Sequence, residues 1–127
     1  MEEIFKKYPL LKEQNVPRET LIEFELFVSM LKKINEEINI ISKETAKNDV
    51  IRERHISDSA QIVEFIDLNS NVITDIGSGG GMPGIVISIM IKKHKNSGKV
   101  RLYEKSHHKS SFLRKVSRDL KLNTEVM

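Results

Sequence analysis

The chain has 127 residues, a length that fits about one domain with a single modest core. Its hydrophobic content of 39% and charged content of 31% are those of a soluble globular protein, and it has no run of about 20 apolar residues that would span a membrane. The absence of cysteine excludes disulfides, thiolate metal sites and thiol nucleophiles, and the N-terminus lacks the features of a signal peptide. We therefore expect a cytoplasmic protein.

Residues 1–71 are predicted to form an N-terminal helical region. After Pro17, apolar residues recur every three or four positions, which predicts an amphipathic helix with Asn15 as a nearby cap. Polar residues 39–48 predict a loop, and a second helix is predicted over 49–66. The apolar face of the first helix consists of Leu21, Phe24, Val28, Leu31, Ile34 and Ile38. The inner stripe of the second consists of Ile51, His55, Asp58, Ser59, Ile62 and Ile66.

From residue 72 the pattern changes to strands alternating with helices. The β-branched segment 72–76 predicts a buried strand, and Pro83 opens a helix that runs to about Ile91. A polar connection over 92–98, a strand over 99–104, a helix over 110–120 and the start of a third strand over 124–127 follow. This order predicts an α/β fold with a parallel, doubly wound sheet. Because three strands are few for such a sheet, we expect residues 72–127 to be an incomplete cofactor-binding domain of a truncated chain.

The glycine-rich turn after the first predicted strand is a candidate cofactor site, because such a turn places its ligand at the carboxyl end of the strand. Residues 79–84, GGGMPG, satisfy the dinucleotide pattern G-x-G-x-x-G. Glu104 then stands where an NAD site has its ribose-binding acid. A nicotinamide-dependent reductase is therefore one interpretation.

The same glycine-rich turn also fits a second motif, which begins at Asp75 and continues with Gly77, Gly79 and Gly81. This is the acid-plus-three-glycine pattern of class I methyltransferases. A carboxylate pointing into the turn repels a pyrophosphate but attracts the cationic ammonium and sulfonium of S-adenosylmethionine. Electrostatics therefore favour the methyl donor, with Glu104 accepting hydrogen bonds from its ribose hydroxyls.

Four polar residues, Arg54, His55, Asp58 and Ser59, are predicted to share one side of the second helix and to interrupt its apolar stripe. They form either part of a site or a local surface ion pair, and their spacing alone does not decide. No arrangement of histidines and carboxylates has the spacing of a metal site.

More than half of the Lys and Arg residues lie between Lys92 and Lys121, a segment in which only Glu104 and Asp119 are acidic. Such a one-sided basic segment is typical of a surface that binds a polyanion. A solvated, lysine-rich surface is the alternative.

Several motifs together resemble the bacterial 16S rRNA guanine-N7 methyltransferases, also called the glucose-inhibited division protein B family. The resemblance runs from about Val16 onward. The matching segments, in chain order, are MLKKIN at 30–35 with INI at 38–40, RHISDS at 54–59, DIGSGGGMPGI at 75–85, LYE at 102–104, and Lys109 with FL at 112–113.

The resemblance implies a Rossmann-like class I methyltransferase fold, S-adenosylmethionine as cofactor, and 16S rRNA of the small ribosomal subunit as the partner of the basic segment. It implies cofactor contacts at Gly77 and Met82, with Asp75, Gly79, Gly81 and Glu104 around the ligand. It also implies that Arg54, His55 and Asp58 lie beside the active site as catalytic residues.

The sequence departs from the family at several positions. Ile34 replaces the usual Trp, Ile41 the usual Thr and Lys109 the usual Arg, and Lys105-Ser106 does not reproduce the Ser that commonly follows the acid. Family members continue through further strands that supply adenine contacts and an arginine near the target base. A catalytically weak remnant that binds RNA or a partner is therefore a further hypothesis.

Overall fold

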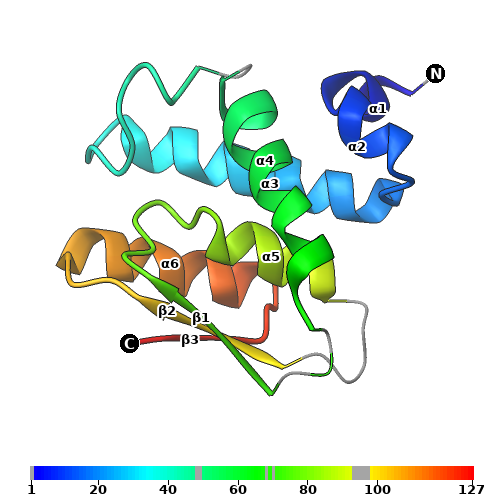
Figure 1. Ribbon diagram of the computed structural model, residues 1–127. Coiled ribbons are helices and arrows are strands. Elements are labelled where there is room, and N and C mark those ends of the chain that lie inside the picture. Colours follow the sequence, from blue (N-terminus) through cyan, green and yellow to red (C-terminus); the bar gives the residue numbers. More distant parts are fainter. Residues whose placement is uncertain (1, 48–49, 68, 70, 93–97) are drawn as a thin grey trace.

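The computed structural model describes residues 2–47, 50–67, 69, 71–92 and 98–127 (Figure 1). Its layers are a three-stranded sheet, two helices on one face of that sheet, and the N-terminal helices outside them. Both the parallel α/β fold and the preceding helical region are therefore confirmed.

The N-terminal part contains α1 (Glu3–Lys7), α2 (Pro9–Glu13) and α3 (Arg18–Asn35). The first two helices were not predicted individually, but α3 was, and its apolar face is buried from Leu21 to Leu31. The prediction that Asn15 caps this helix is wrong. Pro17 is the N-cap residue, and Asn15 instead adopts a positive φ of 61° in the turn before it.

The second predicted helix is a succession of three helical types. A π-helix, η1 (Val50–Ile56), leads into α4 (Ser57–Gln61), and a 3-10 helix, η2 (Ile62–Phe65), ends the segment. Because i→i+5 bonding makes a wider turn, the buried side passes from Ile51 to Ile56 rather than to His55. The predicted inner stripe is therefore wrong at Asp58 and Ile62, which are both exposed.

The three predicted strands are all present, as β1 (Val72–Ile76), β2 (Lys99–Tyr103) and β3 (Thr124–Val126). They pair in parallel in the order β1-β2-β3, with Asp75 opposite Leu102. The crossovers are α5 (Gly84–Ile91) and α6 (His107–Asp119). Helix α6 starts three residues before the predicted position, where the Ser106 side chain accepts a hydrogen bond from the Lys109 amide.

One face of the sheet is covered and the other is open. Val100 and Leu102 of β2 are buried on the side where α5 packs, whereas Ile76 of β1 is 84% exposed on the other side. The prediction that β1 is a buried strand is therefore wrong for the described chain, in which β1 forms one edge of the sheet.

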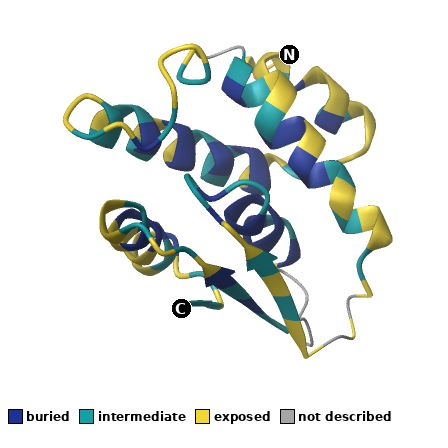
Figure 2. Cartoon of the chain, turned by 60° about the vertical axis from the view of Figure 1, so that its left-hand side comes forward, coloured by how far each residue is buried: buried dark blue, intermediate teal, exposed yellow. Residues whose placement is uncertain are grey.

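A single hydrophobic core joins the two parts of the chain. Helix α5 is buried on nearly every side because it lies between the sheet and the N-terminal helices (Figure 2). The rings of Phe27 on α3 and Phe112 on α6 stack with centroids 6.4 Å apart. The proposed domain boundary at residue 71 stays a prediction.

Candidate functional site

The glycine turn lies at the carboxyl end of β1 and leads directly into α5 (Figure 1). The amides of Gly77 and Ser78 both donate to the carbonyl oxygen of Tyr103, at 2.8 and 3.0 Å, so the turn is fastened to the end of β2. Gly77, Gly79 and Gly81 all have positive φ, which side chains other than glycine seldom adopt. The local sequence thus fixes a left-handed turn at this edge of the sheet.

Gly84 begins α5 at the point where the helix comes closest to the sheet. A Cβ atom added there would lie 2.3 Å from Cδ2 of Leu102 and 2.5 Å from Oδ2 of Asp75. The close approach lets the Gly84 amide donate to Asp75 Oδ2 at 3.0 Å.

The Asp75 carboxylate therefore lies beneath the turn, against the first residue of α5. The sequence predicts that it points into the turn toward a ligand, but it is absent from the side chains that line the hollow described below. Burial raises the pKa of Asp75, and the nearby charge of Glu104 acts in the same direction. The hydrogen bond from Gly84 opposes both effects.

Glu104, just after β2, joins the turn to α6. Its Oε2 accepts from the Ser106 amide at 2.9 Å, and its Oε1 accepts from the Gly79 amide at 2.8 Å. These backbone bonds, aided by the charges of Lys109 and Lys105, lower the pKa of Glu104 and keep it ionised. The predicted ribose-binding acid is thus also a structural support of the glycine turn.

A hollow of about 500 Å³ opens at the carboxyl ends of the strands. That volume is within the range of ligand pockets. Its lining residues are Ile76, Gly77, Tyr103, Glu104, Lys105 and Met127. Of the predicted cofactor residues it contains Gly77 and Glu104, while Gly79 is attached through its bond to Glu104. Gly81 and Met82 lie outside it, Met82 packing against the core.

Sequence reasoning missed the apolar part of this hollow, which is formed by Ile76, Tyr103 and Met127. Ile76 and Tyr103 are opposite each other in the register of β1 and β2. The available signal was their position, since the last residues of parallel strands share one edge of a sheet.

The three predicted catalytic residues lie on η1 and α4. Arg54 and Asp58 are exposed and His55 is half-buried. Within the described chain none of their three side chains forms a hydrogen bond or an ion pair. The local surface ion pair between Arg54 and Asp58, one of the two alternatives that the spacing left open, is therefore absent there.

A partly buried polar network that sequence reasoning missed holds η1 in place. The Arg52 guanidinium binds Glu25 of α3 through Nη2 at 2.6 Å and Nε at 2.9 Å, and the Tyr8 hydroxyl also donates to Glu25. Burial favours the neutral carboxyl, but the hydrogen bonds from Arg52, Tyr8 and Lys7 outweigh it and lower the pKa of Glu25 to about 2. Burial and the adjacent carboxylate raise the pKa of Tyr8.

The structure describes part of the basic segment between Lys92 and Lys121. Exposed cations follow the outer side of α6, among them Arg114, Lys115 and Arg118. Lys93, His94 and Lys95 lie outside the described residues. In the part of the chain that the structure describes, no cluster of His, Asp and Glu could hold a metal ion, and no helix is long and apolar enough to cross a membrane.

The fold and the turn together define the class of protein. A parallel sheet whose first strand ends in a glycine turn, with an acid at the end of the second strand, is a Rossmann-like sheet of the class I methyltransferase type. Residues 20–127 match the family described as rRNA small subunit methyltransferase G. The chain belongs to this family, and the resemblance noted in its sequence is confirmed.

Curated relatives carry the name ribosomal RNA small subunit methyltransferase G. The chain is 85% identical over its whole length to that of Pelagibacter ubique, of which it covers 60%. It is 36% identical to that of Cereibacter sphaeroides over 93% of the chain and 56% of the relative. It is 39% identical to that of Rickettsia felis over 88% of the chain and 55% of the relative. The chain thus spans a little over half the length of these relatives.

Proposed function

We propose that this chain is the cofactor-binding part of an S-adenosylmethionine-dependent methyltransferase that acts on guanine N7 of 16S rRNA in the small ribosomal subunit. Family membership supports methyl transfer to ribosomal RNA, because the relatives are named for it. In this proposal residues 72–127 hold the cofactor, and the helical region 1–71 supplies residues that face the RNA.

The observation that carries the proposal is how the amides of the turn are used. Those of Gly77 and Ser78 donate to Tyr103, and that of Gly81 donates to Ser78. The Gly79 and Gly84 amides donate to carboxylates. A pyrophosphate needs free amides at such a turn and suffers from adjacent negative charge. The turn therefore suits a cationic cofactor without phosphate better than a dinucleotide.

The residues around the hollow fit S-adenosylmethionine. Each oxygen of Glu104 accepts one backbone hydrogen bond and keeps a second lone pair for a ribose hydroxyl. A Cβ atom on Gly77 would meet nothing within 4 Å, so this residue borders open space. Ile76 and Tyr103 offer apolar surface beside it.

The proposed reaction requires mainly that the methyl group and guanine N7 be aligned. When bound, S-adenosylmethionine supplies an electrophilic methyl group. Guanine N7 has a free lone pair and carries no proton, so no general base is required. The protein then has to hold and orient the two reactants and stabilise the positive charge that develops on the base. We assign the orientation of the RNA to Arg54, His55 and Asp58, whose side chains have no partner in the described chain.

The cofactor assignment is tested with Glu104→Ala and a matched Glu125→Ala. Glu125 is an acid on the neighbouring strand β3, paired with Lys99 and Arg101 and outside the hollow. Loss of a charge-assisted hydrogen bond should weaken S-adenosylhomocysteine binding about tenfold or more in Glu104→Ala only. Equal affinities for the two variants would show that Glu104 does not bind the cofactor.

The reaction is tested by nucleoside mass spectrometry of 16S rRNA from a deletion strain, with and without this chain. Restored 7-methylguanosine establishes the activity. Retained cofactor binding without restored methylation would instead support a remnant that binds but does not catalyse.

A further inference from the structure

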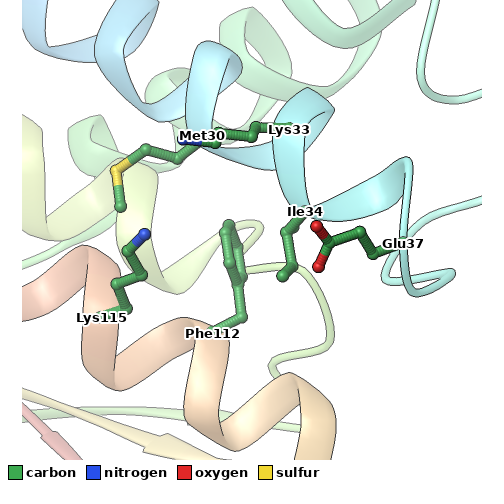
Figure 3. A pocket seen from close by; sticks show the side chains of 6 residues that line it. All are labelled: Met30, Lys33, Ile34, Glu37, Phe112 and Lys115. Carbon is green, nitrogen blue, oxygen red and sulfur yellow. The ribbon is translucent and has the colours of Figure 1, made fainter.

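A second cavity, away from the hollow at the strand ends, lies between α3 and α6 (Figure 3). It has a volume of about 160 Å³. It is lined by Met30, Lys33, Ile34, Glu37, Phe112 and Lys115. The function proposed above uses none of these residues.

The floor of this α3–α6 pocket is apolar. Figure 3 shows the Phe112 ring rising from α6 toward α3, with Ile34 beside it and the Met30 sulfur reaching down from α3. An apolar protein cavity of about 150 Å³ is known to hold one benzene molecule. The pocket thus has room for a single six-membered aromatic ring.

The rim of the pocket is charged. Lys33 and Lys115 contribute a cation from each helix, and Glu37 contributes one carboxylate. Within the described residues, none of the three side chains forms an ion pair or a hydrogen bond, and all three residues are exposed. Two unpaired ammonium groups beside an apolar slot suit an aromatic ring that carries an anionic group.

Helix α3 connects this pocket to the glycine turn. A Cβ on Gly80 would lie 3.5 Å from Leu31 Cδ2 and 2.8 Å from Ile41 Cγ2, so the turn packs on this end of the helix. Met30 and Ile34, which line the pocket, flank Leu31 on the same helix. The pocket and the glycine turn therefore pack against the same end of α3.

We propose that the α3–α6 pocket binds a pyrimidine nucleotide of single-stranded RNA. Its ring contacts Phe112 and Ile34, and its phosphate lies between Lys33 and Lys115. Carboxylates accept hydrogen bonds from the amino group of cytosine, so Glu37 favours cytosine over uracil. The inference rests on the proposed function for its choice of RNA as ligand.

The test is binding of a ten-nucleotide oligocytidylate to the 127-residue chain, measured by fluorescence anisotropy at fixed salt. Ile34→Trp fills the pocket without changing charge and should weaken binding about fivefold or more, as expected for a lost stacking contact. Lys33→Ala should weaken binding more than Lys32→Ala, which removes the same charge from the same helix outside the pocket. Oligouridylate should bind the wild-type chain more weakly than oligocytidylate.

Unchanged affinity of a folded Ile34→Trp variant would overturn the proposal, and so would equal losses from Lys33→Ala and Lys32→Ala, because both results indicate nonspecific attraction between charges. Equal binding of the two probes would overturn the assignment of cytosine. A parallel titration with S-adenosylhomocysteine separates the two proposals. If that ligand fails to bind the wild-type chain, the cofactor assignment fails. The RNA affinities still test whether the α3–α6 pocket binds a nucleotide.

Discussion

The glycine turn and the helical segment 50–65 differ in how many of their polar groups are bonded within the chain. In the turn, the amides of Gly77 and Ser78 are bonded to β2 and that of Gly79 to Glu104, while the Asp75 carboxylate accepts from the first residue of α5. In the helical segment, Arg52 is fixed by Glu25, but Arg54 and Asp58 extend outward without partners.

Under the proposed function, the difference teaches that a rigid cofactor site and an accessible substrate surface need different amounts of internal bonding. The turn is organised before its ligand arrives, which lowers the entropic cost of binding. In that proposal, the side chains of the helical segment stay free to bind a flexible polyanion, while the partly buried Arg52–Glu25 pair fixes the backbone beneath them. The following variants test this contrast, from the largest expected effect to the smallest.

Gly84→Ala should be the most disruptive change at the turn. The added methyl group would overlap Leu102 and Asp75, so we expect a loss of about 3 kcal/mol in the free energy of unfolding. Gly77→Ala is the matched control, since it meets no neighbour and costs only the left-handed φ of 73°, about 1 kcal/mol. Urea unfolding of both variants measures the difference. Equal losses of stability in the two variants would mean that the close contacts of Gly84 are not what makes a side chain unfavourable there.

Glu25→Gln should remove about 2 kcal/mol, because it leaves the half-buried Arg52 without its ionic partner. The pKa of Glu25 is lowered in the folded chain from 4.5 to about 2, so its stabilising effect is present above the ordinary value and is lost as the pH falls. The stability difference between wild type and variant should therefore shrink between pH 4.5 and about pH 2. A difference that stayed constant over this range would contradict the assigned role of the ion pair.

Asp75→Asn should have a smaller effect with the opposite pH dependence. Asn keeps an oxygen that can accept from the Gly84 amide but loses the buried charge. Because burial raises the pKa of Asp75, the ionised carboxylate weakens folding as the pH rises above its ordinary value of 3.8. Thermal unfolding of the variant should thus compare more favourably with wild type at neutral pH than at acidic pH. The reverse trend would show that the charged carboxylate stabilises the turn.

Arg54→Ala and Asp58→Ala should leave stability unchanged within about 0.5 kcal/mol, because both side chains are exposed and unpaired in the described chain. Their effect should appear in RNA affinity or methylation instead. A loss of stability comparable to that of Glu25→Gln would place them in the scaffold and remove them from the candidate site.

The local parts of this architecture were predictable from the sequence. The β-branched run before the glycines, the helical spacing of Phe112, Leu113 and Val116, and the position of Glu104 all depend on neighbouring residues. The structure reproduces the resulting strand–turn–helix order.

The remaining features depend on contacts or bonding patterns that no short window of sequence contains. The i→i+5 bonds of η1 moved the buried side of the second helix away from Asp58 and Ile62. The Glu25–Arg52 pair joins residues 27 positions apart. The direction of the Asp75 carboxylate follows from how closely α5 approaches the sheet at Gly84.

The most direct test of the central claim is calorimetric titration of the wild-type chain with S-adenosylhomocysteine and, separately, with NADH. A turn in which the amides of Gly77, Ser78, Gly79 and Gly81 are internally bonded and two carboxylates lie close by should bind S-adenosylhomocysteine and show no measurable heat with NADH. Tighter binding of NADH would contradict the account and restore the dinucleotide interpretation of the same glycines.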